Sequence, residues 1–154
     1  MIIERVALAL LILMAGAFGL NLATGTARFL DTFETYDQLA FSVAEFTYNG
    51  PREPVDVAIR VSNPSEHDIE LIAVELTYRT AGRSMGGGET RPTMTLAAGE
   101  SVVVPVAGNI AFPTHLEGLG PDPELTWVVN GRISVRLNRN LDWEWVAFGF
   151  EATT

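Results

Sequence analysis

Two residue types are absent from this chain, and a third is rare. There is no cysteine, which excludes a disulfide framework, a thiolate nucleophile and a zinc–thiolate site. There is no lysine, so every basic residue is arginine. The only histidines are His67 and His115, and neither has a second ligand at metal-binding spacing. We therefore expect no metal, no cofactor and no catalytic residues, and a fold held by its core alone.

Positive charge is also scarce. The formal net charge is −9 at pH 7, and Glu4 and Arg5 cancel, so residues 6–154 carry all of it. An acidic surface repels phosphate backbones, which argues against nucleic acid as a partner. No convergent polar motif points to a small-molecule ligand either, and we expect none.

One long run lacks ionisable side chains altogether. It extends from Val6 to Ala23, with Leu13 near its centre. As a helix these eighteen residues would measure about 27 Å, close to the hydrocarbon thickness of a bilayer. We predict that residues 1–23 form a retained transmembrane helix. The alternatives are a cleaved signal peptide and a buried core helix; the start is not basic on balance, which disfavours a signal peptide.

The predicted span contains the small residues Gly16 and Gly19. They could form a face that lets a second membrane helix approach closely. Small residues are also common in single spans, so both interpretations stay open. Positive-inside counting favours a cytoplasmic N-terminus, because acidic residues outnumber Arg28 just after the run. We expect a single-pass protein of the inner or plasma membrane whose C-terminal domain is periplasmic or extracellular.

Residues 24–38 form a juxtamembrane segment with its own pattern. Phe29, Phe33 and Tyr36 recur at helical spacing, with acidic residues between them. The segment is predicted to be a short amphipathic helix that either continues the span or lies along the headgroups. Its aromatic residues could instead dock against partner subunits.

From Leu39 onward the hydrophobic period changes from 3.6 to 2, which is typical of strands. The expected strands are residues 55–62, 72–78, 93–96, 101–107, 125–129, 133–137 and 143–151. Residues 82–88 are predicted to be a glycine-rich loop. Pro105 marks its strand as an edge or a bulge. Asn130–Gly131 forms either a hairpin turn or a glycine bulge within one long strand.

This pattern predicts an all-β domain over residues 39–154. About seven short antiparallel strands favour a two-sheet β-sandwich of immunoglobulin or fibronectin-III type. Its core is expected to contain Val57, Ile59, Val61, Val74, Leu76, Val104, Val135 and Phe148.

The exported part resembles the water-stress and hypersensitive-response (WHy) domain of type 2 late-embryogenesis-abundant (LEA) proteins. The resemblance covers residues 41–150 and depends on three motifs. They are a strand running into Asn63–Pro64, a Leu96-x-x-Gly99 turn before a valine-rich strand ending in Pro105–Val106, and the aromatic strand 127–135 with Gly131 inside it. The resemblance implies a small β-sandwich linked to desiccation stress or membrane-associated roles, without a catalytic site.

Trp143 and Trp145 flank Glu144 in the last expected strand. They would share one face of it, which suggests a sugar-binding platform but more often indicates core or interface. We expect a non-catalytic protein whose exported domain is an accessory subunit of a larger membrane complex. Its contacts would be the lipid bilayer and other membrane-protein subunits, through Phe29, Phe33, Tyr36, Trp143 and Trp145. The alternative is a membrane-anchored, stress-protective LEA-like domain.

Overall fold

The computed structural model describes residues 2–117, 125–137 and 142–153, without the side chains of residues 2–13, 15, 28 and 29. The chain divides into two units, Met1–Asp37 and Gln38–Thr154. The first is one continuous α-helix, α1 (Ile2–Gln38). The predicted span and the juxtamembrane segment therefore belong to the same helix.

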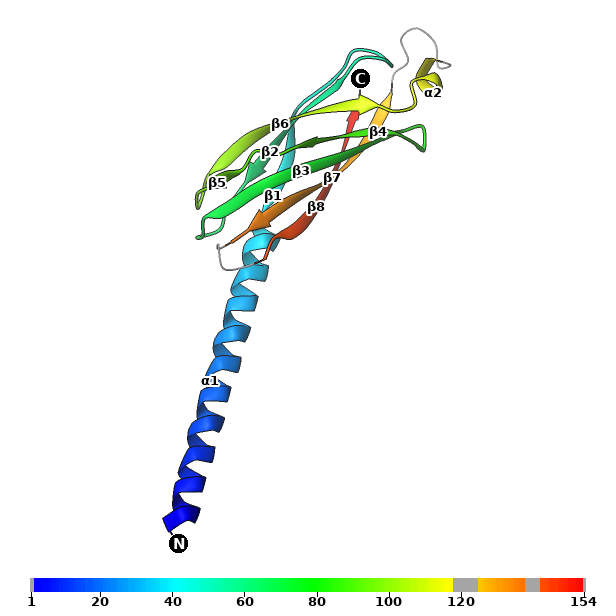
Figure 1. Ribbon diagram of the computed structural model, residues 1–154. Helices are drawn as coiled ribbons and strands as arrows, with labels where there is room; N and C mark the ends of the chain where they lie inside the picture. The colour runs from blue at the N-terminus through cyan, green and yellow to red at the C-terminus, as the bar shows by residue number, and fades with distance from the viewer. Residues whose placement is uncertain (1, 118–124, 138–141, 154) are drawn as a thin grey trace. The chain divides into compact units, whose positions relative to one another are not determined.

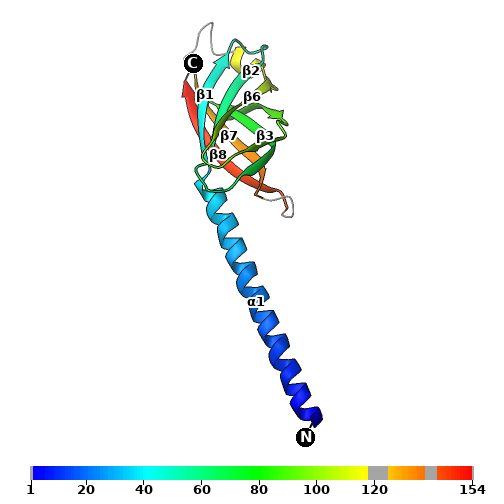
Figure 2. The ribbon, with the colours of Figure 1, turned by 90° about the vertical axis from the view of Figure 1, so that its left-hand side faces the viewer.

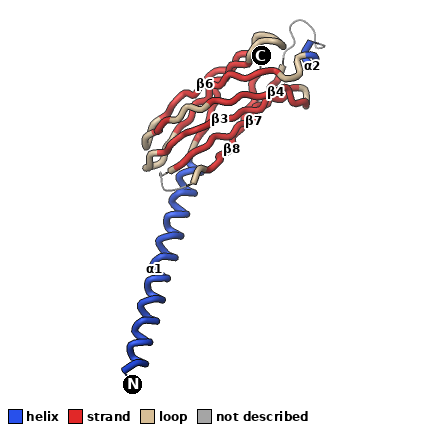
Figure 3. The backbone as a smooth tube through the Cα atoms, viewed as in Figure 1, coloured by secondary structure: helices blue, strands red, loops and turns tan. Residues whose placement is uncertain are grey.

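The second unit is built almost entirely of antiparallel strands (Figure 3). In chain order these are β1 (Ala40–Tyr48), β2 (Val55–Ser62), β3 (Ile69–Thr80), β4 (Arg83–Thr90), β5 (Met94–Leu96), β6 (Ser101–Ile110), β7 (Thr126–Arg136) and β8 (Glu144–Thr153). A single helical turn, α2 (Thr114–Glu117), follows β6. The all-β prediction is confirmed, and the bounds of β2 agree with the alternation in the sequence.

The strands form one sheet in the order β1-β2-β6-β4-β3-β7-β8, with β5 beside β3 (Figure 1). The sheet curls until its two edge strands, β1 and β8, lie next to each other (Figure 2). Phe41 of β1 stacks on Phe148 of β8 with ring centroids 4.7 Å apart. The result is a nearly closed, barrel-like sheet, so the immunoglobulin-type arrangement of two sheets is not confirmed.

Inward-facing side chains of this sheet form the core. All the predicted core residues are buried except Phe148, which is half-buried between the edge strands. In β3, Val74, Leu76 and Tyr78 are buried as the alternation predicts, but Ile72 is only half-buried. The pairing of β3 with β7 shifts register at this point, and a register shift moves the following side chains to the other face.

The predicted glycine-rich loop is wrong for most of its length. Only Ala81 and Gly82, both with positive φ, turn the chain, while Gly86–Gly88 lie inside β4. A Cβ on Gly88 would lie 2.9 Å from Oη of Tyr78 and 2.7 Å from the carbonyl oxygen of Ala107. Glycine is therefore needed here for close packing, because β4 passes directly over a buried ring.

Gly131 lies inside the single strand β7, so the hairpin interpretation of Asn130–Gly131 is wrong. It pairs with Leu76 on one side and Phe148 on the other, without a register shift at that position. A Cβ there would collide with the Phe148 ring and lie 2.8 Å from Cδ2 of Leu76. The glycine makes room for the aromatic side chain of the neighbouring strand.

Pro105 lies in the part of β6 that pairs with β2 only. β4 contacts β6 through residues 86–88 and 108–110, and residues 101–107 have no further partner strand among the described residues. The sequence-based expectation of an edge position is therefore confirmed locally. Proline lacks an amide donor and protects this open edge against pairing with another chain.

Two of the motifs behind the WHy resemblance meet in space. Asn63 is fully buried, and its side-chain amide donates hydrogen bonds to the carbonyl oxygens of His67 (2.7 Å), Ala97 (3.1 Å) and Leu96 (3.2 Å). Its Oδ1 accepts a 2.6 Å hydrogen bond from Oγ of Ser65. The asparagine of the Asn–Pro motif thus joins the β2–β3 connection to the Leu-x-x-Gly turn.

Candidate functional site

The helix residues predicted to lie in the membrane can be placed only in part. The side chains of Val6 and Leu13 lie outside the described residues, whereas Gly16, Gly19 and Ala23 are exposed. Within the part of the chain that the structure describes, no helix is both long enough and apolar enough to cross a membrane.

The predicted docking aromatics on α1 are also partly described. The side chain of Phe29 lies outside the described residues, Phe33 is 61% exposed, and Tyr36 is half-buried. Docking by these residues therefore stays a prediction.

Trp143 and Trp145 share one face of the sheet, as their spacing predicts, and this is the outer face, where each contacts an exposed or half-buried arginine. The guanidinium carbon of Arg132 lies 4.4 Å from the ring centroid of Trp145, and Arg132 also forms an ion pair with Glu75 (2.6 Å). Trp143 has the same arrangement, with Arg136 at 4.3 Å. Arg136 in turn forms an ion pair with Glu70. An arginine therefore covers one side of each tryptophan ring, and docking by these residues stays a prediction.

A groove lies on the outer face of the sheet, and the sequence did not predict it. It crosses β6, β4, β3, β7 and β8 and has a volume of about 680 Å³. Its polar lining consists of Glu75, Thr77, Glu89, Asn109, Asn130 and Arg132, and its small residues are Gly87, Gly88, Ala107, Gly131 and Ala147.

Strand register explains how the groove forms. Asn109, Gly87, Thr77 and Asn130 are cross-strand neighbours in one row, which ends at Gly149 of β8. Side chains of directly opposed residues lie about 5 Å apart, so the polar groups form a continuous line. The glycines in this row leave gaps beside Thr77 and Asn130, and the gaps form the hollow.

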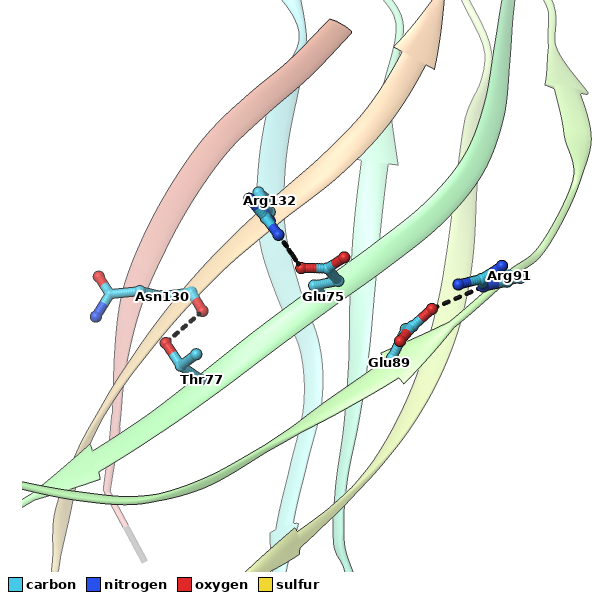
Figure 4. Close-up of polar contacts among 6 residues, drawn as sticks. All are labelled: Glu75, Thr77, Glu89, Arg91, Asn130 and Arg132. Atoms are coloured by element: carbon cyan, nitrogen blue, oxygen red, sulfur yellow. Dashed lines mark hydrogen bonds and ion pairs between the residues drawn. The ribbon is translucent and has the colours of Figure 1, made fainter. Parts of the chain in front are cut away.

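A second row bounds the groove on one side. Arg132 lies opposite Glu75, and Glu75 lies opposite Glu89. Figure 4 shows Arg132 pointing at the carboxylate of Glu75, while Arg91 pairs with Glu89 at 2.7 Å. The hydroxyl of Thr77 donates a 3.2 Å hydrogen bond to the main-chain carbonyl of Asn130 (Figure 4).

The ion pairs also balance the charge of the groove. The hydrogen bond that Arg91 donates to Glu89, together with the negative charge of Glu89, raises the pKa of Arg91. Both carboxylates are therefore compensated by an arginine, and the groove has little net charge although the chain is acidic.

One sequence signal could have indicated these residues. Glu75 and Thr77, like Asn130 and Arg132, are polar pairs at strand spacing, which places both members of each pair on one outer face. The sequence does not show that the two strands are neighbours in the sheet. Without that order and register, the pairs are indistinguishable from any solvated strand face.

Tyr78 and Trp127 each bury a polar atom of the side chain inside the barrel. Among the described side chains, Oη of Tyr78 and Nε1 of Trp127 are the buried polar atoms without a hydrogen-bond partner. Burial, and secondarily the negative charge of Asp56, raises the pKa of Tyr78 to about 12. The tyrosine is fully buried, so ionising it inside the fold is unfavourable.

This pKa predicts a loss of stability at alkaline pH. The Tyr78 hydroxyl holds its proton more tightly in the folded state than in the unfolded state, where its pKa is near 10. Stability is unaffected below pH 10 and falls as pH rises towards 12, by about 2–3 kcal/mol in total. We expect Tyr78→Phe to remove this fall, measured by urea unfolding at pH 8 to 11.5. An equal alkaline loss in both proteins would contradict the prediction.

The two histidines stay apart from the groove. Both are exposed, and His115 stacks on Phe112 with ring centroids 5.6 Å apart. Among the described residues, no group of three or more histidine, aspartate or glutamate side chains could hold a metal ion.

The curled antiparallel sheet has a LEA-like fold, to judge from the solved structures that are similar to it. The solution structure of a protein described as late embryogenesis abundant superposes with a TM-score of 0.57 at 14% identity, covering 91% of this chain and 84% of that chain. A solution structure from Arabidopsis thaliana gives a TM-score of 0.54 at 14% identity, covering 75% of this chain and 76% of the other. No protein-family model matches the chain, and no curated protein sequence matches it. At these identities the similarity concerns the fold.

Proposed function

We propose that this protein is a non-catalytic, stress-protective LEA-like β-domain, exported and held at a bilayer by helix α1. The LEA-like fold supports the first part of this proposal, because one of the structural neighbours is described as late embryogenesis abundant. This neighbour favours the stress-protective alternative over the accessory-subunit expectation. The anchoring part is supported by the exposure of side chains on α1.

The observation that carries the proposal is a group of large apolar side chains that α1 exposes between Met14 and Leu22. Met14, Phe18 and Leu22 expose 72%, 70% and 62% of their areas, and they follow one another at i, i+4 and i+8. Leu20, on another side of the helix, exposes 72%. Large apolar side chains exposed on two sides of a helix favour an apolar environment, which a bilayer provides.

The hydroxyl groups of this helix support the same environment. Oγ1 of Thr24 donates to the carbonyl oxygen of Leu20 at 2.9 Å, and Oγ1 of Thr26 donates to that of Leu22 at 2.9 Å. Both hydroxyls are thus satisfied within the helix and need no water. This is the arrangement required where polar groups enter the edge of a membrane.

The charge of the exported part suggests how such a domain protects. Domains carrying a net charge of −9 on two facing bilayers repel each other at short range. They would keep membranes apart as water is withdrawn, without any catalytic group.

We predict that Leu13→Arg weakens membrane insertion of α1, since an arginine near the centre of a span costs about 3 kcal/mol. The natural chain should resist carbonate extraction, and the variant should be released to a much greater extent. Ser84→Arg, in β4 of the exported domain, is a matched control that should leave retention unchanged. Equal release of Leu13→Arg and the natural chain would refute anchoring by this segment.

The absence of cysteine allows a direct topology test. The cysteine of Ser84→Cys, at an exposed position, should react with a membrane-impermeant maleimide on intact cells. The cysteine of Ile3→Cys should react only after the cells are permeabilised. The reverse pattern would overturn the proposed orientation.

A second candidate is the accessory subunit, and one observation favours it. Leu30 and Phe33 expose 52% and 61% of their areas at i, i+3 spacing, beyond the predicted span. Such a stripe could contact helices of a partner subunit. Mild, non-denaturing extraction distinguishes the candidates: co-purifying subunits that are lost in Phe33→Ala support docking, and a protein that travels alone supports the protective role.

The protective role has its own test. Vesicles reconstituted with the full chain should leak less trapped dye after drying and rehydration than vesicles with an unrelated single-span protein at equal density. Equal leakage would contradict protection of the membrane.

A further inference from the structure

We propose that the groove across the outer face of the sheet binds an uncharged, hydroxyl-rich linear chain, that is, a neutral oligosaccharide. The inference goes beyond the proposed function and does not depend on the membrane anchor. It follows from the shape of the groove, its hydrogen-bonding groups and its charge balance.

The groove has the shape for an extended ligand. It crosses five neighbouring strands, which are about 4.8 Å apart, so it is about 19 Å long. The glycines and alanines along it leave main-chain CH groups and methyl groups on its surface. This surface suits the flat, apolar faces of successive sugar rings, and the length suits about four of them.

The polar groups suit hydroxyls. The side chains of Asn109 and Asn130 each offer both donors and an acceptor, and both are exposed at the groove. Between them lies the hydroxyl of Thr77. It donates its hydrogen to the carbonyl of Asn130, and its oxygen can still accept a hydrogen bond from a ligand. Sugar hydroxyls also donate and accept, so this alternation of groups matches them.

The charge balance of the groove favours an uncharged ligand over an ionic one. Glu75 and Arg132 neutralise each other, as do Glu89 and Arg91. A phosphate or carboxylate ligand would be repelled by Glu75 and Glu89, and a cation would be repelled by Arg132 and Arg91. An uncharged ligand can bind while both ion pairs stay intact.

A peptide fits less well than a sugar chain. Peptide and protein partners are typically held by large apolar or aromatic anchors in pockets. The apolar side chains lining this groove are Ala107 and Ala147, with Leu76 buried below them. The groove offers no such pocket in the residues that line it.

The test uses the full chain in a phosphocholine detergent, because maltoside and glucoside headgroups are themselves sugars. The probes are cellohexaose, maltohexaose and chitohexaose as neutral chains, hexagalacturonate as an anionic chain, and a Gly–Ser decapeptide. We expect titration calorimetry and amide chemical shifts to detect binding of one or more neutral hexasaccharides at the groove. Neither hexagalacturonate nor the decapeptide should bind.

Two variants separate groove binding from non-specific binding. Asn130→Ala should weaken binding about tenfold by removing a two-way hydrogen-bonding group, and Ala147→Leu should weaken it by filling the groove. Asn49→Ala, at an exposed loop residue away from the groove, is the matched control and should bind normally. All three should retain the thermal unfolding midpoint of the natural chain.

The proposal is overturned if no neutral hexasaccharide binds, if the decapeptide or the anionic chain binds instead, or if Asn49→Ala weakens binding as much as Asn130→Ala. These results do not depend on carbonate extraction or topology, so failure here is distinguishable from failure of the membrane proposal.

Discussion

Replacing Asn63 by aspartate is expected to destabilise the β-domain by about 4 kcal/mol at pH 7. The side-chain amide of Asn63 donates to three main-chain carbonyls and is fully buried. A carboxylate in the same place would face three carbonyl oxygens with no proton to donate. Both the lost hydrogen bonds and the buried unpaired charge contribute to this cost.

The expected pH dependence of Asn63→Asp identifies the mechanism. The carbonyls and burial should raise the pKa of the introduced carboxyl, so the protonated form is favoured in the folded state. Relative to the natural chain, the variant should therefore be less destabilised at pH 4 than at pH 7, and progressively worse as pH rises through the raised pKa. Urea unfolding at both pH values measures this. Asn49→Asp, at an exposed position, is the control and should change stability little. A similar small effect of both substitutions would show that Asn63 does not join the two connections.

Replacing Gly108 by valine is expected to cost about 4 kcal/mol of stability. Gly108 lies in β6 between Val55 of β2 and Gly88 of β4, so the backbone there cannot move freely. A Cβ would lie 2.7 Å from Cζ of Tyr78 and still closer to its hydroxyl oxygen. The ring is fully buried and has no space into which to retreat.

A double-mutant cycle tests that explanation. Tyr78→Ala alone should also cost about 4 kcal/mol, through the cavity it leaves. If the ring causes the clash, the double variant should be about 2 kcal/mol more stable than the sum of the two single effects predicts. Thermal and urea unfolding of the four proteins give this coupling energy. A coupling energy near zero would show that valine disturbs strand pairing at Gly108 rather than the Tyr78 ring.

Both experiments test contacts between segments that are far apart in the sequence. Asn63–Pro64 and Leu96-x-x-Gly99 were recognisable as motifs, but the sequence separates them by more than thirty residues. Their contact exists because β2 and β6 pair through Ser62 and Ser101, which brings the ends of both motifs together. Similarly, Gly88 of β4 belonged to a predicted glycine-rich loop until the position of Tyr78 showed that this glycine is needed for packing.

Local sequence signals were sufficient for strands with a clean alternation of apolar and polar residues. The alternation of Val57, Ile59 and Val61 predicted β2 and its inward face, because side chains alternate with a period of two in any strand. The same signal failed at Ile72, where a register shift that depends on the neighbouring strand changes the face. It also did not distinguish a two-sheet sandwich from one curled sheet, because inward and outward positions alternate in both.

By itself the sequence determined that residues 39–154 form an antiparallel β-domain, that its core is aliphatic and aromatic, and that an apolar helical segment precedes it. Hydrophobic periodicity is a local property, so these features could be derived without knowing which strands are neighbours. Only the tertiary structure decided the strand order, the contact between Asn63 and the Leu96–Gly99 turn, and the groove containing Thr77, Asn109 and Asn130. Each of these depends on pairings between distant segments, and their register is set by how the whole sheet buries its core.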